Sequence, residues 1–392
     1  MDRAALSNLL DGRTVLRDAS ASGNLKVMAA LLGPAFRGLI ARRGREATIA
    51  MPLRHDARFD WEYTRRFPEL GRLYEVAKSA QWNAASDLDW SRPVDPTDPA
   101  HPLLPDSFLP VVTLPIWRRL SERERNVQRH AMAGWLLSQF LHGEQAALFA
   151  ASQVTQAVPW YEGKLFGGTQ VVDEARHVEA FSTYLTRKLE RLYRIDDNLF
   201  VLVDALMSGS DWDLKFLGMQ ILIEGLALGA FGTIRARTGD ALLKELLTYV
   251  IDDEARHVWY GVLALKRHYV DEHQTTPERE DWAFEIVLLL RNRFFAHEFY
   301  DEFYGHAMTR AQWDELVLAS DLMAAFRDTM LKRIIPNLRR IGLLSPRVQA
   351  RYEAIDALRY AGGKDAGQLT RQELLEDDTA AATPGPAARA AG

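Results

Sequence analysis

The pentapeptide Asp-Glu-Ala-Arg-His occurs at residues 173–177 and again at residues 253–257. A single glutamate precedes each copy at the same interval: Glu144 stands as far before Glu174 as Glu224 stands before Glu254. Each residue of the first set lies the same number of residues before its counterpart in the second, so that Glu144 corresponds to Glu224, Glu174 to Glu254 and His177 to His257. One arrangement of acidic and imidazole side chains is therefore present in duplicate.

The spacing inside each pentapeptide predicts a helix with two ligands on one face. Residues three apart lie on the same side of a helix, so Glu174 points with His177, and Glu254 points with His257. Carboxylates with imidazoles suit iron or manganese, whereas thiolates would favour zinc or copper(I). Glu144 and Glu224 add one carboxylate each, so the negative charges of four carboxylates balance the positive charges of two divalent ions. The predicted metal ligands, which are also the predicted catalytic residues, are Glu144, Glu174, His177, Glu224, Glu254 and His257.

The surroundings of Glu224 support this interpretation. Apolar residues enclose it on both sides in the stretch Ile221–Leu228. A carboxylate on an apolar helix face is costly unless it is paired or bound to a metal. The alternative is a pair of salt-bridged helices whose motifs coincide by chance, and two identical pentapeptides in register with their partner glutamates disfavour it.

A second set of polar residues is expected behind the histidines. Asp173 and Asp253 stand one turn before His177 and His257, where a carboxylate can accept a hydrogen bond from the ring nitrogen that does not bind metal. Arg176 and Arg256 would neutralise these aspartates, either within one helix or crossed between the two copies. The simpler alternative for the arginines is an exposed ion pair on a helix surface.

Helical periodicity dominates the chain and strand signals are weak, so the predicted fold class is all-α. Residues 1–120 are expected to form N-terminal helices and a strap, rich in proline over residues 92–116, packed on a bundle. Residues 121–360 form the bundle itself, and residues 361–392 a disordered tail. Long helices are expected over residues 121–158, 159–193, 211–238 and 240–270, with further helices over 24–43, 70–80, 198–207, 277–304, 310–341 and 346–358.

Composition excludes several classes of protein. A net charge of −5 and a pI near 6.1 argue against nucleic acid as the main partner. The absence of cysteine excludes disulfides, cysteine-ligated iron–sulfur clusters and thiol catalysis in this sequence. Without a Gly-x-Gly-x-x-Gly fingerprint after a strand, electrons for a redox centre would come from another protein. No apolar run suggests a membrane span or signal peptide, so a cytoplasmic location is expected.

With these motifs in place, the chain resembles the ferritin-like di-iron carboxylate superfamily. Within that superfamily it resembles the hydroxylase subunits of bacterial multicomponent monooxygenases and the small subunit of ribonucleotide reductase. The resemblance covers residues 121–270, and Gly143 and Ala147 match small residues beside the first-helix glutamate. It implies a ferritin-like four-helix bundle core with flanking helices, two Fe ions with Mn possible at one or both sites, and activation of O2.

Three positions depart from related enzymes. Leu228 stands where the monooxygenases place a threonine, and Phe181 where the reductase small subunits place a radical tyrosine. Val250 stands where arylamine N-oxygenases place a third histidine. A named activity therefore does not carry over. Plant-type acyl carrier desaturases share the Glu-x-x-His pair and a similar length, which keeps a desaturase as an alternative.

The residues one turn from the glutamates are mostly apolar and predict a pocket for a hydrocarbon, aromatic or acyl substrate. The alternative is that they only pack the bundle core. Three glycines, Gly225, Gly229 and Gly232, suggest close packing or a channel in the third helix. The segment 82–90 is expected to anchor the strap, or else to close the site or pass electrons through Trp90. The predicted pocket residues are Phe140, Gly143, Ala147, Leu148, Phe181, Gln220, Leu228 and Phe231.

The predicted function is a di-iron monooxygenase that uses O2 to hydroxylate or N-oxidise a small, largely apolar organic substrate. Its expected partners are a ferredoxin or flavin reductase and a second copy in a homodimer. The first alternative is an acyl-chain desaturase acting on a carrier-bound substrate, for which Arg42, Arg43 and Arg45 are a weak basic surface. The second is a metal-binding partner subunit of a larger oxygenase, or an iron store. The six retained ligands disfavour a structural subunit, and the length of the chain disfavours storage.

Overall fold

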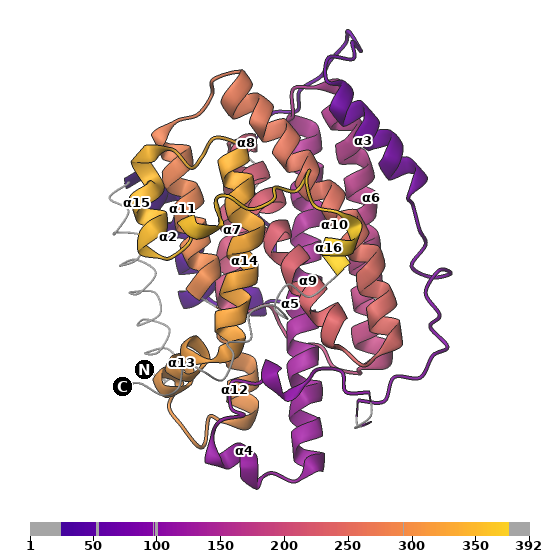
Figure 1. Cartoon of the computed structure of the whole chain (residues 1–392), viewed down its shortest axis with the longest axis vertical. Coiled ribbons are helices and arrows are strands. Elements are labelled where there is room, and N and C mark those ends of the chain that lie inside the picture. The colour runs from indigo at the N-terminus through magenta and orange to yellow at the C-terminus, as the bar shows by residue number, and fades with distance from the viewer. Residues whose placement is uncertain (1–24, 52–54, 97, 99–100, 293, 376–392) are drawn as a thin grey trace.

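Four long helices lie side by side in the computed structural model, which describes residues 25–51, 55–96, 98, 101–292 and 294–375 (Figure 1). They are α5 (Glu122–Ala157), α6 (Tyr161–Thr183), a helix assembled from three segments over residues 212–237, and α10 (Ala241–Lys266). The three segments are α8 (Trp212–Phe216), the π-helical η5 (Leu217–Ile223) and α9 (Glu224–Arg237). Every regular element among the described residues is a helix, which confirms the all-α prediction.

The beginnings of these helices follow local sequence signals. Ser121 Oγ accepts from the backbone N–H of Glu124 at 3.3 Å, and the Glu124 carboxylate accepts from the backbone N–H of Ser121 at 2.7 Å. This is the capping box that the sequence predicts before α5. Asp240 caps α10 by accepting from the backbone N–H of Leu243 at 2.6 Å. Each cap satisfies backbone donors that the helix itself leaves unpaired.

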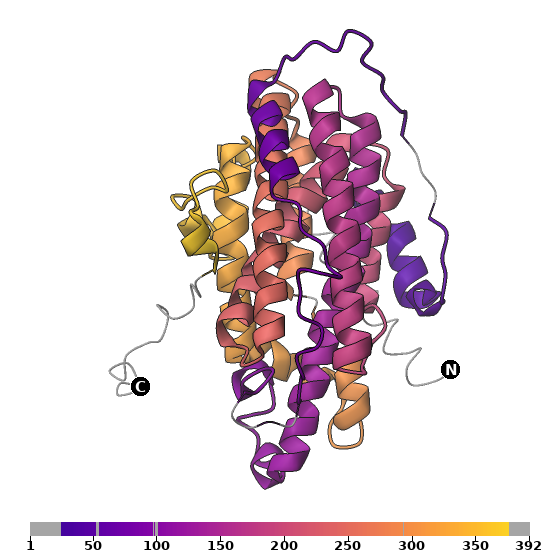
Figure 2. The same ribbon diagram turned by 90° about the vertical axis from the view of Figure 1, so that its right-hand side faces the viewer.

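Flanking helices cover the bundle, and Figure 2 shows α14 with the C-terminal segment on one side and the α5–α6 pair on the other. The helices expected over 277–304 and 310–341 are each two helices. Ala296, with a left-handed φ of 52°, is the residue before α12, and Ser320 begins α14 by accepting from the backbone N–H of Met323 at 3.2 Å. The flanking α-helices are α2 (Leu25–Ala35), α3 (Pro68–Ser79), α4 (Pro115–Arg119), α7 (Asp197–Ser208), α11 (Pro277–Asn292), α12 (His297–Phe303), α13 (Arg310–Ala319), α14 (Asp321–Arg340), α15 (Pro346–Ala354) and α16 (Arg371–Leu375).

The glycines of α9 serve close packing. A Cβ on Gly229 would lie 2.7 Å from Cγ2 of Thr329 on α14, and a Cβ on Gly232 would lie 3.1 Å from the carbonyl oxygen of Leu374. The segment carrying Leu374 therefore packs on α9, although the sequence predicts a disordered tail from residue 361. Of that predicted tail, residues 376–392 lie outside the described residues.

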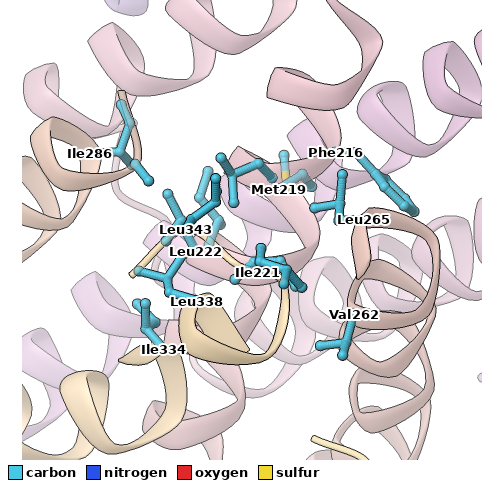
Figure 3. Packing of buried hydrophobic residues seen from close by; sticks show 14 of the residues in the cluster. Phe216, Met219, Ile221, Leu222, Val262, Leu265, Ile286, Ile334, Leu338 and Leu343 are labelled. Atoms are coloured by element: carbon cyan, nitrogen blue, oxygen red, sulfur yellow. The ribbon is translucent and has the colours of Figure 1, made fainter. Parts of the chain in front are cut away.

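Two apolar clusters form the core. The first joins the η5 segment to α10, α11 and α14, and Figure 3 shows Met219, Ile221 and Leu222 packed among Val262, Leu265 and Ile334. The second contains Phe181, Phe231 and Trp313. It also takes in buried residues of the proline-rich strap, among them Leu103, Leu104 and Phe108, so the strap is anchored by its own side chains.

One helix, Trp212–Arg237, is long and apolar enough to cross a membrane by length and composition alone. The sequence by itself predicts no such run. Most of it, 72% of its most apolar stretch, is buried inside the bundle, as expected for a core helix.

A buried lysine in α8 gives a pH-dependent contribution to stability. The side chain of Lys215 is 2% exposed, and its Nζ donates to the carbonyl oxygen of Met207 at 2.9 Å and to Gln153 Oε1. Burial lowers the pKa of Lys215 from 10.5 to about 8. Between these values the unfolded chain binds the proton more tightly, so stability must rise with pH across that window.

We expect this rise to amount to on the order of 2 kcal/mol between pH 8 and pH 10.5, allowing for solvent screening. Urea unfolding of the wild type and of Lys215→Met at several pH values measures it. The variant should lack this increment, because methionine does not titrate. An identical pH dependence in both proteins would contradict the assignment.

Candidate metal centre

Six side chains from four helices meet at the middle of the bundle. Their candidate ligand atoms fall into two groups, and within each group these atoms lie within 4.8 Å of one another. All six residues are at most 5% exposed. Glu174 and Glu254 belong to both groups, so they stand between the two positions. The first group is Glu144, Glu174, His177 and Glu254; the second is Glu174, Glu224, Glu254 and His257.

The helices aim these side chains as the spacing predicts. Glu174 and His177 share a face of α6, and Glu254 and His257 share a face of α10. Glu224 is the first residue after the π-helical turn η5, a distortion that often occurs at functional sites. Gly261 on α10 makes room for this turn, since a Cβ there would lie 2.6 Å from Cβ of Gln220.

The two histidines present the same nitrogen to the carboxylates. His177 Nδ1 lies 3.0 Å from Glu144 Oε2 and 3.1 Å from Glu254 Oε1. His257 Nδ1 lies 3.2 Å from Glu174 Oε1. The Nδ1 atoms therefore face the centre, and the Nε2 atoms face outward.

Although the histidine Nδ1 atoms lie within ion-pair distance of the carboxylates, the centre contains buried atoms that have no aligned hydrogen-bond partner. They are Glu174 Oε2, Glu224 Oε2, both carboxylate oxygens of Glu254, and His257 Nδ1. Such atoms normally find a partner, because a buried polar atom without one costs free energy. Their convergence from three helices is what a bound cation would resolve, so the donor set fits a pair of divalent metal ions.

Electrostatics lead to the same conclusion. Burial, together with the charge of Glu254, raises the pKa of Glu144 and of Glu224 well above the usual range. Burial also opposes ionisation of Glu174, yet the neighbouring His257 and His177 hold its pKa below the usual range. The carboxylates therefore depend on positive charge nearby, which two divalent ions would supply.

The aspartates behind the histidines are crossed between the two copies of the motif. His177 Nε2 lies 3.0 Å from Asp253 Oδ2, and His257 Nε2 lies 3.2 Å from Asp173 Oδ2. Arg176 donates to Asp173 and, at 3.2 Å, to Asp253, so one guanidinium joins the two pairs. The contacts between histidine and aspartate are therefore crossed between the two copies, whereas each arginine pairs with the aspartate of its own helix, Arg176 with Asp173 and Arg256 with Asp253.

Two residues after α3 complete this outer layer. Gln81 Nε2 donates to Asp173 Oδ1 at 2.9 Å, and Trp82 Nε1 donates to Asp253 Oδ2 at 2.7 Å. The Trp82 ring also stacks on Tyr249, with centroids 4.8 Å apart. The residue of segment 82–90 that reaches the site is therefore Trp82 and not Trp90, whose indole donates to the carbonyl oxygen of Ala84 at 2.6 Å.

Gln170 makes a contact that was not predicted from the sequence. Its Nε2 donates to Glu174 Oε1 at 3.1 Å and to Glu224 Oε1 at 2.9 Å. Gln220 Nε2 in turn donates to Gln170 Oε1 at 3.3 Å. The signal for Gln170 was its place four residues before Glu174, on the same helix face.

The predicted pocket residues are partly a packed aromatic group. Phe140 and Phe231 have ring centroids 4.7 Å apart, and Phe181 and Phe231 have theirs 5.7 Å apart. Ala147 and Leu228 are buried, Leu148 is half-buried, and a Cβ on Gly143 would meet no atom within 4 Å. A role for these residues in binding substrate stays a prediction.

The arrangement of the ligands is that of ferritin-like di-metal carboxylate proteins. Two helices carry a Glu-x-x-His pair, two carry a single glutamate, and all six side chains point into one bundle.

No family model matches the sequence, and no curated protein matches it. Two solved structures of R2-like ligand-binding oxidases with an aerobically reconstituted Mn/Fe cofactor are similar to the chain, one of them a single-substitution variant. Both are 18% identical; they cover 80% and 77% of this chain and 95% and 94% of their own, with TM-scores of 0.39 and 0.36. At such low TM-scores the likeness is distant, and the function proposed below rests on the residues of this chain.

Proposed function

We propose that the chain is a di-metal oxidoreductase that binds two Fe ions, or Mn at one or both positions, and uses O2 to hydroxylate or N-oxidise a small apolar substrate. The observation that carries the proposal is the buried cluster of ligand atoms without partners on four of the six residues. Such donors suit iron and manganese. Electrons would come from a separate ferredoxin or flavin reductase, and a homodimer stays a prediction.

When bound, the metals would supply redox chemistry with O2, and the chain's own residues determine where it occurs. Glu174 and Glu254 belong to both ligand groups and would hold the two ions together. The crossed aspartates fix the histidine rings through Nε2, which leaves Nδ1 for a metal. The ring of Phe166 lies 6.4 Å from that of His257, and the ring of Trp82 lies 6.4 Å from that of His177. These rings help to keep bulk water from the ligands.

The burial of the cluster favours oxidation over metal-assisted hydrolysis. Hydrolytic two-metal sites act on polar substrates and need a water molecule bound at the metals. Here the six ligands are at most 5% exposed, and buried apolar clusters contribute Phe166 and Phe181 nearby. Small apolar molecules and O2 enter such an interior more readily than charged substrates.

The structure does not favour the desaturase alternative. A carrier-bound acyl chain would need a basic surface for the acidic carrier. Arg43 pairs with Glu46 at 3.1 Å, and Arg45 pairs with Asp197 at 3.7 Å. Two of the three arginines of the predicted basic surface are thus already neutralised by carboxylates.

Metal content and O2 uptake test the proposal. The metal-free protein is reconstituted with Fe(II) without oxygen, analysed for iron, and then mixed with O2 while absorbance and oxygen consumption are recorded. We expect two irons per chain and stoichiometric O2 consumption. Protein loaded with Zn(II), which has no redox chemistry, is the control and should consume none. A chain that binds no iron, or binds iron that stays inert to O2, would refute the proposal.

A further inference from the structure

The two halves of the site share their ligands but differ one turn away from them. At the constant offset that relates the two motifs, Gln170 corresponds to Val250, four residues before the second Glu-x-x-His. Gln220 corresponds to Phe140, four residues before the single glutamates. The first half therefore has Phe140 and Gln170 at these positions, and the second half has Gln220 and Val250. The polar residue precedes the Glu-x-x-His pair in the first half and the single glutamate in the second.

The two glutamines meet at one end of the cluster. Gln220 Nε2 donates to Gln170 Oε1 at 3.3 Å, and both side chains are 0% exposed. At the corresponding place in the other half, Phe140 faces Phe181, with ring centroids 6.3 Å apart. Phe181 corresponds in turn to Gly261, whose missing side chain leaves the room that Gln220 uses. The duplicated site thus has an amide end and an aromatic end.

The amide of Gln170 joins ligands from both halves. A carboxamide nitrogen has two N–H donors, and here they go to Glu174 Oε1 at 3.1 Å and to Glu224 Oε1 at 2.9 Å. Metal-bound carboxylates are ionised and only accept, so they suit this orientation, with the amide nitrogen toward the ligands and the amide oxygen toward Gln220. Gln220 therefore acts on the ligands only through Gln170.

This contact makes the two glutamates of the single-ligand helices unequal. Glu224 has one oxygen held by the amide and leaves the other, Oε2, without a partner. Glu144 corresponds to Glu224, but the residue corresponding to Gln170 is Val250, which offers no side-chain donor. The contact of Glu144 Oε2 is with His177 Nδ1.

We propose that Gln170, oriented by Gln220, is a positioning residue that fixes Glu224 and makes the metal position of Glu224 and His257 differ in affinity from that of Glu144 and His177. The inference rests on the proposed di-metal function and extends it from the number of metals to their inequivalence. The two ions would bind in two steps with separate dissociation constants.

Titration of metal-free protein with Mn(II), followed by the electron paramagnetic resonance signal of free Mn(II), measures the two steps. We expect two dissociation constants in the wild type. In Gln170→Val, which copies the corresponding Val250, one constant should rise about 10–100-fold, as for other residues that orient a metal ligand. Gln220→Leu should raise the same constant by a smaller factor.

A double variant provides the sharper test. Because Gln220 acts through Gln170, Gln170→Val/Gln220→Leu should bind Mn(II) as Gln170→Val alone does. Val250→Ala is the matched control: it truncates the corresponding buried residue and should leave both constants within about threefold. Thermal unfolding of each metal-free variant reports whether it is folded; if Gln170→Val does not fold, Gln220→Leu and the control carry the test.

If Gln170→Val binds two Mn(II) ions with the wild-type dissociation constants, Gln170 has no positioning role, and the proposed function still stands. The same shift in Val250→Ala would also overturn it, because packing alone would then explain the effect. A wild-type chain that binds no Mn(II) would instead count against the di-metal function itself.

Discussion

Glu224→Gln should lower the metal content from two ions per chain to about one and, at the same time, stabilise the metal-free protein. Glu224 belongs to only one of the two ligand groups, so the other group keeps all its members. Glu254 belongs to both, and Glu254→Gln is therefore expected to lose both ions. The stoichiometry thus distinguishes a ligand of one position from a ligand between two.

The expected stabilisation follows from the state of Glu224 without metal. Its carboxylate is 3% exposed, Oε2 has no partner, and Glu254 adds a like charge. Glutamine has the same shape, and its Oε1 still accepts from Gln170. Replacing this unfavourably buried ionisable group should raise the free energy of unfolding of the metal-free protein by about 1–4 kcal/mol, the range seen when buried ion pairs are replaced by well-packed residues of similar volume.

Elemental analysis and urea unfolding measure the two effects. Glu179→Gln, an exposed glutamate on α6, is the control and should change neither. A fall in metal content together with a rise in the free energy of unfolding of the metal-free protein is expected of a binding site. If Glu224 instead held the bundle together through salt bridges, Glu224→Gln would destabilise the metal-free chain and leave its metal content unchanged.

The duplicated motif allowed the centre of the fold to be predicted because its signals are local. Helix periodicity, the capping box at Ser121 and the three-residue spacing of Glu174 and His177 each depend on neighbours within a few residues. Two copies at a constant interval then require both helices to face one point. These features identified the six residues that the structure brings together.

Residues outside the motif could not be placed in this way. Trp82 reaches Asp253 across 171 positions, and nothing in its own neighbourhood distinguishes it from Trp90. The segment after residue 361 is rich in glycine and alanine, yet Leu374 is buried because Gly232 lets the chain approach α9. Such contacts depend on which surfaces the tertiary fold brings together, and composition carries no record of them.

Asp253→Asn should cost the metal-free protein about 3–5 kcal/mol, the cost typical of breaking a buried ion pair by removing one charge. Four side chains donate to this carboxylate: His177, Trp82 and Arg176 to Oδ2, and Arg256 to Oδ1. Asparagine keeps one acceptor oxygen and replaces the other with a donor. At least one buried donor, and with it the charge of an arginine, then loses its partner.

The same change should weaken metal binding at the position of His177. Its Nε2 contact with Asp253 orients the ring, and loss of such an orienting contact lowers metal affinity about 10–100-fold. Mn(II) titration and urea unfolding of the metal-free variant measure the two losses. Trp82→Phe removes only one of the four donors and should cost no more than about 1.5 kcal/mol.

Asp173→Asn is the comparison that tests whether the duplicated motifs are equal. Asp173 accepts from three side chains, Arg176, Gln81 and His257, whereas Asp253 also accepts from Arg176 of the other motif as its fourth donor. Its replacement should therefore destabilise the chain less than Asp253→Asn, although the two pentapeptides are identical. Equal losses would show that the crossed contact of Arg176 with Asp253 adds nothing to stability. A larger loss at Asp253 would show that the reach of Arg176 to both aspartates makes the two halves differ in stability, although the pentapeptides are identical.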